Sequence, residues 1–114
     1  MTVPETRMNL TLVRAGEGWD AVRVTVAVGR RVMDRLGPAC GSVISDGAHM
    51  WFFVEPGQGG RLMMPGVTVL GTSGYVLMPA DRLTTLPGPH WTRTAFRLAT
   101  STHRLHTALT GVIG

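Results

Sequence analysis

The chain has 114 residues, room for one hydrophobic core, so we expect a single domain over residues 1–114. Hydrophobic residues make up 44% of the sequence and charged residues 16%, but no window holds the roughly 18 consecutive apolar residues that span a bilayer. The 11 basic residues are all arginine and give a net charge of +4, which permits binding to nucleic acid without demonstrating it.

The first third of the chain predicts two strands followed by a helix. Residues 9–14 have the composition of a short strand, and Gly16–Gly18 is typical of a turn. From Asp20 onward, valines alternate with polar residues up to Val26, which predicts a half-buried strand.

A helix of about ten residues should follow this strand. Val28, Val32 and Leu36 recur at a spacing of four, so their side chains share one helix face. Gly37-Pro38 should end the helix, because glycine accepts the left-handed cap conformation and proline cannot continue the hydrogen-bond ladder.

The middle of the chain predicts a β-hairpin. Asp46-Gly47 is a strong two-residue turn signal between the short strand Ser42–Ser45 and the apolar strand Ala48–Val54. Both faces of the second strand are apolar, with His49, Trp51 and Phe53 on one side and Met50, Phe52 and Val54 on the other. We therefore expect this strand to lie in the centre of a sheet.

The last half predicts a second hairpin, an edge strand and a helix. The hairpin joins residues 67–70 to residues 75–78 through Gly71–Gly74, and residues 90–96 form the edge strand. Ser101 caps a final helix with Leu105, Ala108, Leu109 and Val112 on one face. The fold class is therefore α+β: a small, mostly antiparallel sheet of about five to six strands, one helix after the N-terminal strands and one C-terminal helix.

The cellular setting follows from the N-terminus and the single cysteine. Glu5, Arg7 and Asn9 stand where a signal peptide is apolar, so we expect a cytoplasmic protein without membrane contact. Cys40 has no second cysteine to pair with, which excludes an intrachain disulfide and a cysteine-based zinc site. We expect it to be a small buried residue beside a turn.

No set of residues predicts a complete catalytic or metal site. The seven acidic residues are scattered, and no Gly-x-Ser-x-Gly elbow or Walker-type loop is present. His103 and His106 lie three residues apart but lack a local third ligand, so they indicate a solvated helix face. His49 is different, since it opens the central strand: it is either a hydrogen-bonded residue at the sheet end or a residue facing a cleft.

Seven arginines offer a basic face for phosphate binding. They are Arg30, Arg31 and Arg35 on the first helix and Arg82, Arg93, Arg97 and Arg104 in the last third. If they converge, they can follow a phosphate backbone. Aromatic residues are few among them, so the sequence shows no evident platform for stacking bases.

Residues 45–91 resemble part of the bifunctional primase-polymerase domain of actinobacterial and phage replication proteins. That family has a strand of the form Gly-x-His-x-Tyr-Phe, which Gly47–Phe52 matches. It also has a segment Gly-Val-Asp-Val-Arg-Gly-x-Gly-Gly-Tyr-Val-Val-x-Pro, which Gly66–Pro79 follows, and a later Pro-Gly stretch with tryptophan, here Pro87–Trp91. The resemblance implies that His49 contacts nucleotide phosphates.

The chain departs from that family at the metal-binding acids. The family has an Asp-x-Asp pair on an earlier strand, whereas the corresponding residues Ala21–Ala27 include no acid, and Thr68 stands where the family has a further acid. Two-metal phosphoryl transfer depends on such carboxylates. The resemblance therefore implies a catalytically inactive relative that needs no cofactor or metal.

We expect a non-enzymatic binding or regulatory module that acts through a protein partner or self-association, for which the apolar composition leaves surface. The alternative is a nucleic-acid or nucleotide binding protein with a basic cleft near His49. Its candidate phosphate contacts are His49, Arg30, Arg31 and Arg82. A third alternative is a subunit that completes an enzyme site within a complex.

Overall fold

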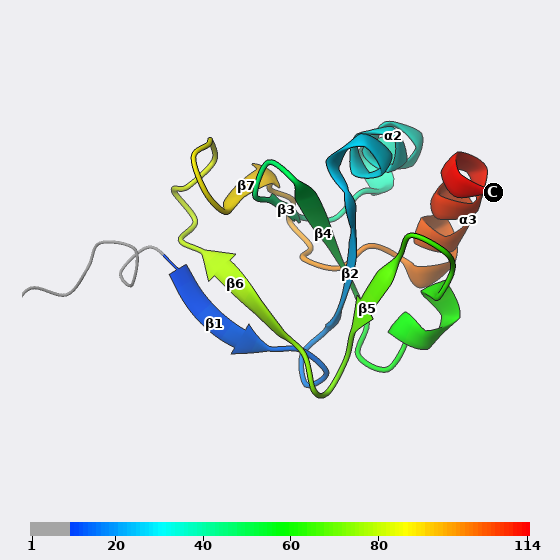
Figure 1. The fold of residues 1–114 in the computed structure, drawn as a ribbon, viewed down its shortest axis with the longest axis horizontal. Helices are drawn as coiled ribbons and strands as arrows, with labels where there is room; N and C mark the ends of the chain where they lie inside the picture. The colour runs from blue at the N-terminus through cyan, green and yellow to red at the C-terminus, as the bar shows by residue number, and fades with distance from the viewer. Residues whose placement is uncertain (1–9) are drawn as a thin grey trace, which may run out of the picture.

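A five-stranded antiparallel sheet forms the centre of the fold (Figure 1). The computed structural model describes residues 10–114. The strands lie in the order β5 (Thr68–Leu70), β2 (Asp20–Thr25), β4 (His49–Val54), β3 (Val43–Ser45) and β7 (His90–Arg93). The predicted α+β class is confirmed, and β4 occupies the central position that its two apolar faces predict.

The connections between strands follow a split β-α-β pattern. Helix α2 (Val26–Leu36) joins β2 to β3, and β4 lies between these two strands. The short 3-10 helix η2 (Gly59–Leu62) lies between β4 and β5, with β2 separating those strands in the sheet. This order of elements is that of the ferredoxin-like β-α-β-β-α-β motif, with a 3-10 turn in place of the second helix.

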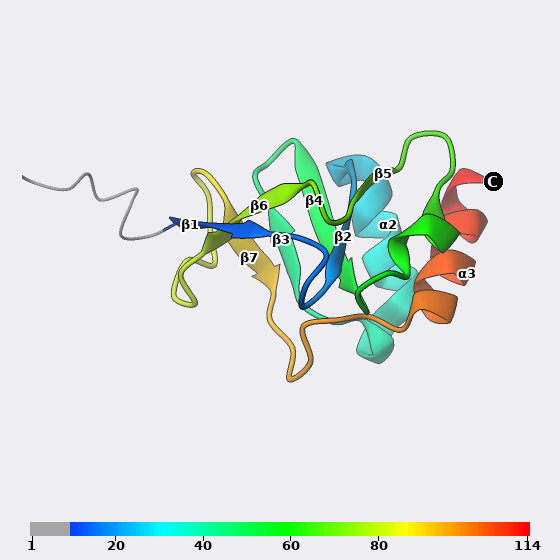
Figure 2. The ribbon, with the colours of Figure 1, turned by 90° about the horizontal axis from the view of Figure 1, so that it is seen from below.

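Helix α2 and the C-terminal helix α3 (Thr102–Ile113) cover one face of the sheet, as Figures 1 and 2 show. The Thr25 side chain caps α2 by accepting from the Val28 N–H, and Ser101 caps α3 as predicted by accepting from the Arg104 N–H. The shared core consists of Val22, Val24, Val43, Met50, Phe52 and Val54 from the sheet, Val32 and Leu36 from α2, Leu105, Ala108 and Leu109 from α3, and Cys40 and Leu62.

The β3–β4 hairpin is confirmed, including its turn. The Asp46 carboxylate accepts from the backbone N–H groups of Ala48 and His49, and Gly47 adopts a φ of 94°, which favours glycine. The alternation along β4 is also confirmed: Met50 and Phe52 pack under the helices, whereas Phe53 belongs to a second cluster on the opposite face.

A two-stranded ribbon, β1 (Leu10–Arg14) paired with β6 (Tyr75–Pro79), covers that opposite face. In Figures 1 and 2 the ribbon and the helices lie on opposite sides of the sheet. The Trp91 indole N–H donates to the Pro79 carbonyl at 2.9 Å and ties the ribbon to β7. Within the second cluster, Phe53 packs against Trp19 and Trp91.

The prediction of a second hairpin is wrong. Residues 68–70 pair with β2, and residues 75–79 pair with β1 in the separate ribbon. The two segments belong to different sheets: Val69 lies opposite Val22 in the central sheet, and Val76 lies opposite Val13 in the ribbon. The chain therefore leaves the central sheet at the glycine-rich turn and enters the ribbon.

The remaining predictions differ mainly in their boundaries. Helix α2 begins at Val26, two residues before the predicted stripe, because Thr25 supplies the cap. The edge strand β7 ends at Arg93 instead of residue 96, since residues beyond it turn back toward Ser42. The predicted start of the first strand at Asn9 lies outside the described residues. No helix between residues 10 and 114 is long and apolar enough to cross a membrane.

Candidate functional site

A cleft of about 230 Å³ lies between the ribbon and the sheet. Its walls are Leu12, Tyr75, Val76 and Leu77 from the ribbon, Ile44 and Trp51 from the sheet, and Asp46 and Pro89 from the loops. The lining is apolar apart from one carboxylate and the tyrosine hydroxyl. Such a lining suits an apolar side chain more than a phosphate group.

The ribbon borders the cleft with large exposed apolar side chains. Leu12 pairs directly with Leu77. Tyr75 lies two residues before Leu77 in the same strand, so its side chain is on the same face of the ribbon. The exposed fractions of Leu12, Tyr75 and Leu77 are 61%, 50% and 46%. The Arg14 guanidinium lies 5.9 Å from the centre of the Tyr75 ring, within cation-π range.

The Asp46 carboxylate places a negative charge beside the cleft. Partial burial acts to raise its pKa, but hydrogen bonds from the backbone N–H groups of His49 and Ala48, together with the His49 charge, lower the pKa below its ordinary value. The group is therefore ionised at neutral pH. A partner that fills the cleft would gain from carrying a cation near its apolar anchor.

Replacing Asp46 by asparagine should remove a small, pH-dependent part of the stability. Asparagine keeps the turn hydrogen bonds, so the change isolates the charge. Because folding lowers the Asp46 pKa, its contribution is complete above the ordinary value of 3.8 and is lost as pH falls through the folded value. Urea unfolding should give a difference of at most about 1 kcal/mol at neutral pH, since the site is largely solvated. A difference that persists in acid would contradict this origin.

His49 faces the ribbon side of the sheet and lies beside the cleft. Its ring centre is 6.3 Å from that of Trp51, which lines the cleft. Arg23, opposite Trp51 on β2, donates to the Thr68 hydroxyl at 3.5 Å. His49 is half-buried and lies beside the ring of Trp51.

The other predicted phosphate contacts lie on different elements. Arg30 and Arg31 are exposed on α2, in the layer that covers the opposite face of the sheet from His49. Arg82 is exposed in the connection between β6 and β7. The structure therefore places His49 and the two α2 arginines on different sides of the sheet.

The acidic residues near the central strands are separated. Asp20 pairs with Val54 at one end of the β2–β4 pair, whereas Asp46 precedes His49 at the other end. The five residue steps along β2 from Asp20 to Thr25 span about 17 Å, too far for the two carboxylates to share one ion. The Asp20 carboxylate accepts from the Gly59 N–H at 2.9 Å. Within residues 10–114, no three His, Cys, Asp or Glu side chains are grouped closely enough to hold a metal ion.

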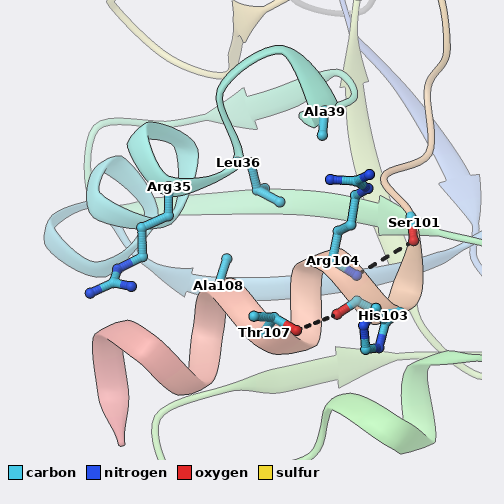
Figure 3. A pocket seen from close by; sticks show the side chains of 8 residues that line it. All are labelled: Arg35, Leu36, Ala39, Ser101, His103, Arg104, Thr107 and Ala108. Carbon is cyan, nitrogen blue, oxygen red and sulfur yellow. Dashed lines mark hydrogen bonds between the residues drawn. The ribbon is translucent and has the colours of Figure 1, made fainter.

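A second hollow, of about 510 Å³, lies between α2 and the first turns of α3 (Figure 3). Arg35 stands at one end and Arg104 at the other, with Leu36 and Ala108 between them. His103 points from α3 away from the Arg104 guanidinium. His103 and His106 are both exposed, in agreement with the predicted solvated helix face.

Cys40 is buried, as predicted. Burial raises the pKa of its thiol, although the nearby charge of Arg93 and the Thr100 hydroxyl act in the opposite direction. A protonated thiol is a poor nucleophile. Cys40 contributes to the packing of the core under the helices.

Comparison of the chain with protein-family models, with curated proteins and with solved structures finds no match. The similarity of residues 45–91 to the primase-polymerase domain therefore stays a prediction. Sequence reasoning missed the ribbon cleft, because it forms only when β1 pairs with β6, more than half the chain away. The one local signal for it was the run of apolar residues in both ribbon strands.

Proposed function

We propose that the chain is a non-catalytic binding or regulatory module of the cytoplasm that acts through a protein partner or through self-association. Its docking surface is the ribbon cleft, defined by the eight residues that line it. The observation that carries this proposal is the apolar hollow with Leu12, Tyr75 and Leu77 exposed at its border. Contiguous apolar surface of this kind, rimmed by polar residues, is typical of protein interaction sites.

Burial of the exposed apolar side chains at this surface would contribute a moderate binding free energy. Complete burial of a leucine or tyrosine side chain contributes roughly 1.5–3 kcal/mol, and only about half of each of these three remains to be buried. The Trp51 wall adds an aromatic surface of the type enriched at interaction hot spots. These contributions suit a weak or moderate protein contact.

The edge of β1 offers a place for a partner strand. Within residues 10–114, β1 pairs only with β6, so its outer edge carries unpaired backbone groups. The β6 edge is the poorer template, because Pro79 has no N–H to donate. A second copy added antiparallel and centred on Leu12 would set Arg14 opposite Leu10, which avoids facing two arginines.

The carboxylates of Asp20 and Asp46 accept hydrogen bonds from the backbone, which supports the non-catalytic part of the proposal. The Asp20 carboxylate binds the Gly59 N–H, and Asp46 holds the hairpin turn. Thr68, at the position of the family's further acid, accepts from Arg23. Among residues 10–114, the acids at the two ends of the β2–β4 pair are engaged by backbone donors, which supports a binding role over two-metal chemistry.

Light scattering after size exclusion tests self-association. At tens of micromolar, we expect the wild-type chain to form a dimer and Leu12→Asp to be monomeric, since Leu12 lies both in the cleft and on the β1 edge. Met63→Asp is the matched control, because Met63 is 73% exposed and lies outside the cleft. It should behave as the wild type.

A wild-type monomer at all concentrations would rule out the second copy as occupant. In that case a different protein is the partner. Affinity capture from the source cells should then recover a protein with the wild type and Met63→Asp but lose it with Leu12→Asp. Identical capture by all three forms, or by none, would overturn the proposal.

A further inference from the structure

Two adjoining hollows meet at Arg104, on the helix side of the molecule. The first lies between α2 and α3, as described above, and the second, of about 390 Å³, lies between η1 (Gly37–Ala39) and the loop over residues 95–99. Ala39, Ser101 and Arg104 line both. We call the combined feature the Arg104 groove.

The Arg104 groove is strongly basic. Arg35, Arg97 and Arg104 line it, and none of its lining residues is acidic. All three arginines are exposed, and no hydrogen bond or ion pair joins their guanidinium groups to another residue in the range 10–114. Three unneutralised cations along one groove favour an anionic ligand.

The three arginines are spread along the groove instead of converging. They come from α2, from the 95–99 loop and from α3. Figure 3 shows the Arg35 and Arg104 side chains directed to opposite ends of the first hollow. This spacing suits a chain of phosphates better than one phosphate group.

An exposed aromatic ring stands beside the basic residues. Phe96 lines the second hollow, and its side chain is fully exposed to solvent. The loop that carries it is held firmly: the Ser42 hydroxyl accepts from the Ala95 N–H at 3.0 Å, and the Ser42 N–H donates to the Leu98 carbonyl at 3.1 Å. The ring therefore stands on a loop held by hydrogen bonds, and within residues 10–114 no packing contact explains its position.

From these observations we infer that the Arg104 groove binds single-stranded nucleic acid, with Arg35, Arg97 and Arg104 on separate phosphates along the strand and Phe96 stacked on a base. Aromatic stacking next to a positively charged groove is the means by which proteins hold single strands without reading sequence. Beyond Phe96 the next hollow is lined by Asp81, so the strand should end there. This inference is independent of the ribbon cleft.

Fluorescence anisotropy tests this inference. A labelled oligothymidylate of about 12 nucleotides is titrated with the full chain at several salt concentrations. Three phosphate contacts predict a slope near −2 for log affinity against log salt, at about −0.7 per contact. Arg97→Ala or Arg104→Ala should reduce the slope by about 0.7. Arg30→Ala is the matched control: it removes the same charge outside the groove and should leave the slope unchanged.

The contribution of Phe96 is separable from that of charge. Phe96→Ala should weaken binding about ten-fold with the salt slope retained, whereas Phe96→Trp should bind at least as tightly as the wild type. Circular dichroism checks that each variant folds, which the exposure of these side chains favours. The salt slope distinguishes this site from the ribbon cleft, where Leu12→Asp should not alter it.

Several results would overturn the inference. They are the absence of oligonucleotide binding at low salt, an equal loss with Arg30→Ala and Arg104→Ala, or an unchanged affinity with Phe96→Ala. Tighter binding to a duplex of the same length would also contradict it, because a duplex has no free base for Phe96. Binding to anionic lipid vesicles without binding to the oligonucleotide would identify a membrane surface as the ligand instead.

Discussion

Replacing Phe52 by alanine is expected to lower the free energy of unfolding by about 3–5 kcal/mol, a large part of the 5–15 kcal/mol typical of a domain. Phe52 lies in the central strand, opposite Val22 on one side and Val43 on the other, and its side chain has no exposed surface. It is in the cluster that joins the sheet to both helices. Its removal leaves a cavity that a close-packed core refills only in part.

Urea unfolding followed by tryptophan fluorescence measures this loss. Met63→Ala is the control, since it truncates a large apolar side chain that is 73% exposed and should change the stability by no more than about 0.5 kcal/mol. The denaturant slope should stay the same in both variants. Equal stabilities of the two variants would show that the core does not depend on Phe52.

The elements predicted correctly are those whose signals are local. The β3–β4 hairpin is set by Asp46, Gly47 and the two short strands around them, all within about a dozen residues. The cap of α3 at Ser101 and the apolar face that starts at Leu105 are likewise adjacent in sequence. Such features need no knowledge of which distant segment lies nearby.

The ribbon could not be predicted because its partner strands are distant. Residues 68–70 and 75–78 flank a glycine-rich turn, so local patterning favours a hairpin between them. The true partner of β6 is β1, and the pairing of Leu12 with Leu77 depends on the whole sheet bringing these strands together. Strand pairing at this sequence separation is determined by tertiary packing.

The candidate sites show the same division between local and distant information. The place of His49 at the start of the central strand follows from the sequence, and the structure confirms it. That Arg35, Arg97 and Arg104 share a groove whereas Arg30 and Arg31 do not depends on how α2 packs on α3. The sequence did not predict that Phe96 is exposed, because the residue pattern placed it in an edge strand.

Replacing Gly41 by alanine is expected to lower the free energy of unfolding by about 2–3 kcal/mol. A Cβ atom at this position would lie 2.5 Å from the Leu98 carbonyl oxygen and 2.8 Å from the Ala99 carbonyl carbon. Both are backbone atoms, so neither can move as a side chain would. The Gly41 N–H also donates to the Thr100 hydroxyl at 2.9 Å, in a buried bond that the shift would stretch.

Gly60→Ala is the matched control, because a Cβ atom there meets nothing within 4 Å. Its stability should remain within about 0.5 kcal/mol of the wild type. Hydrogen exchange gives a local readout: the Thr100 N–H donates to the Phe53 carbonyl at 2.7 Å, and its exchange should accelerate in Gly41→Ala but not in Gly60→Ala. Equal exchange in the two variants would contradict the steric argument.

The same substitution connects the fold to the Arg104 groove. Gly41 lines the second hollow, and the backbone that its Cβ atom would displace belongs to the loop that presents Phe96. Gly41→Ala should therefore weaken oligonucleotide binding through misplacement of the ring, with the salt slope preserved because no arginine is lost. Binding as tight as that of the wild type, despite faster Thr100 exchange, would mean that the position of this loop does not matter for the groove.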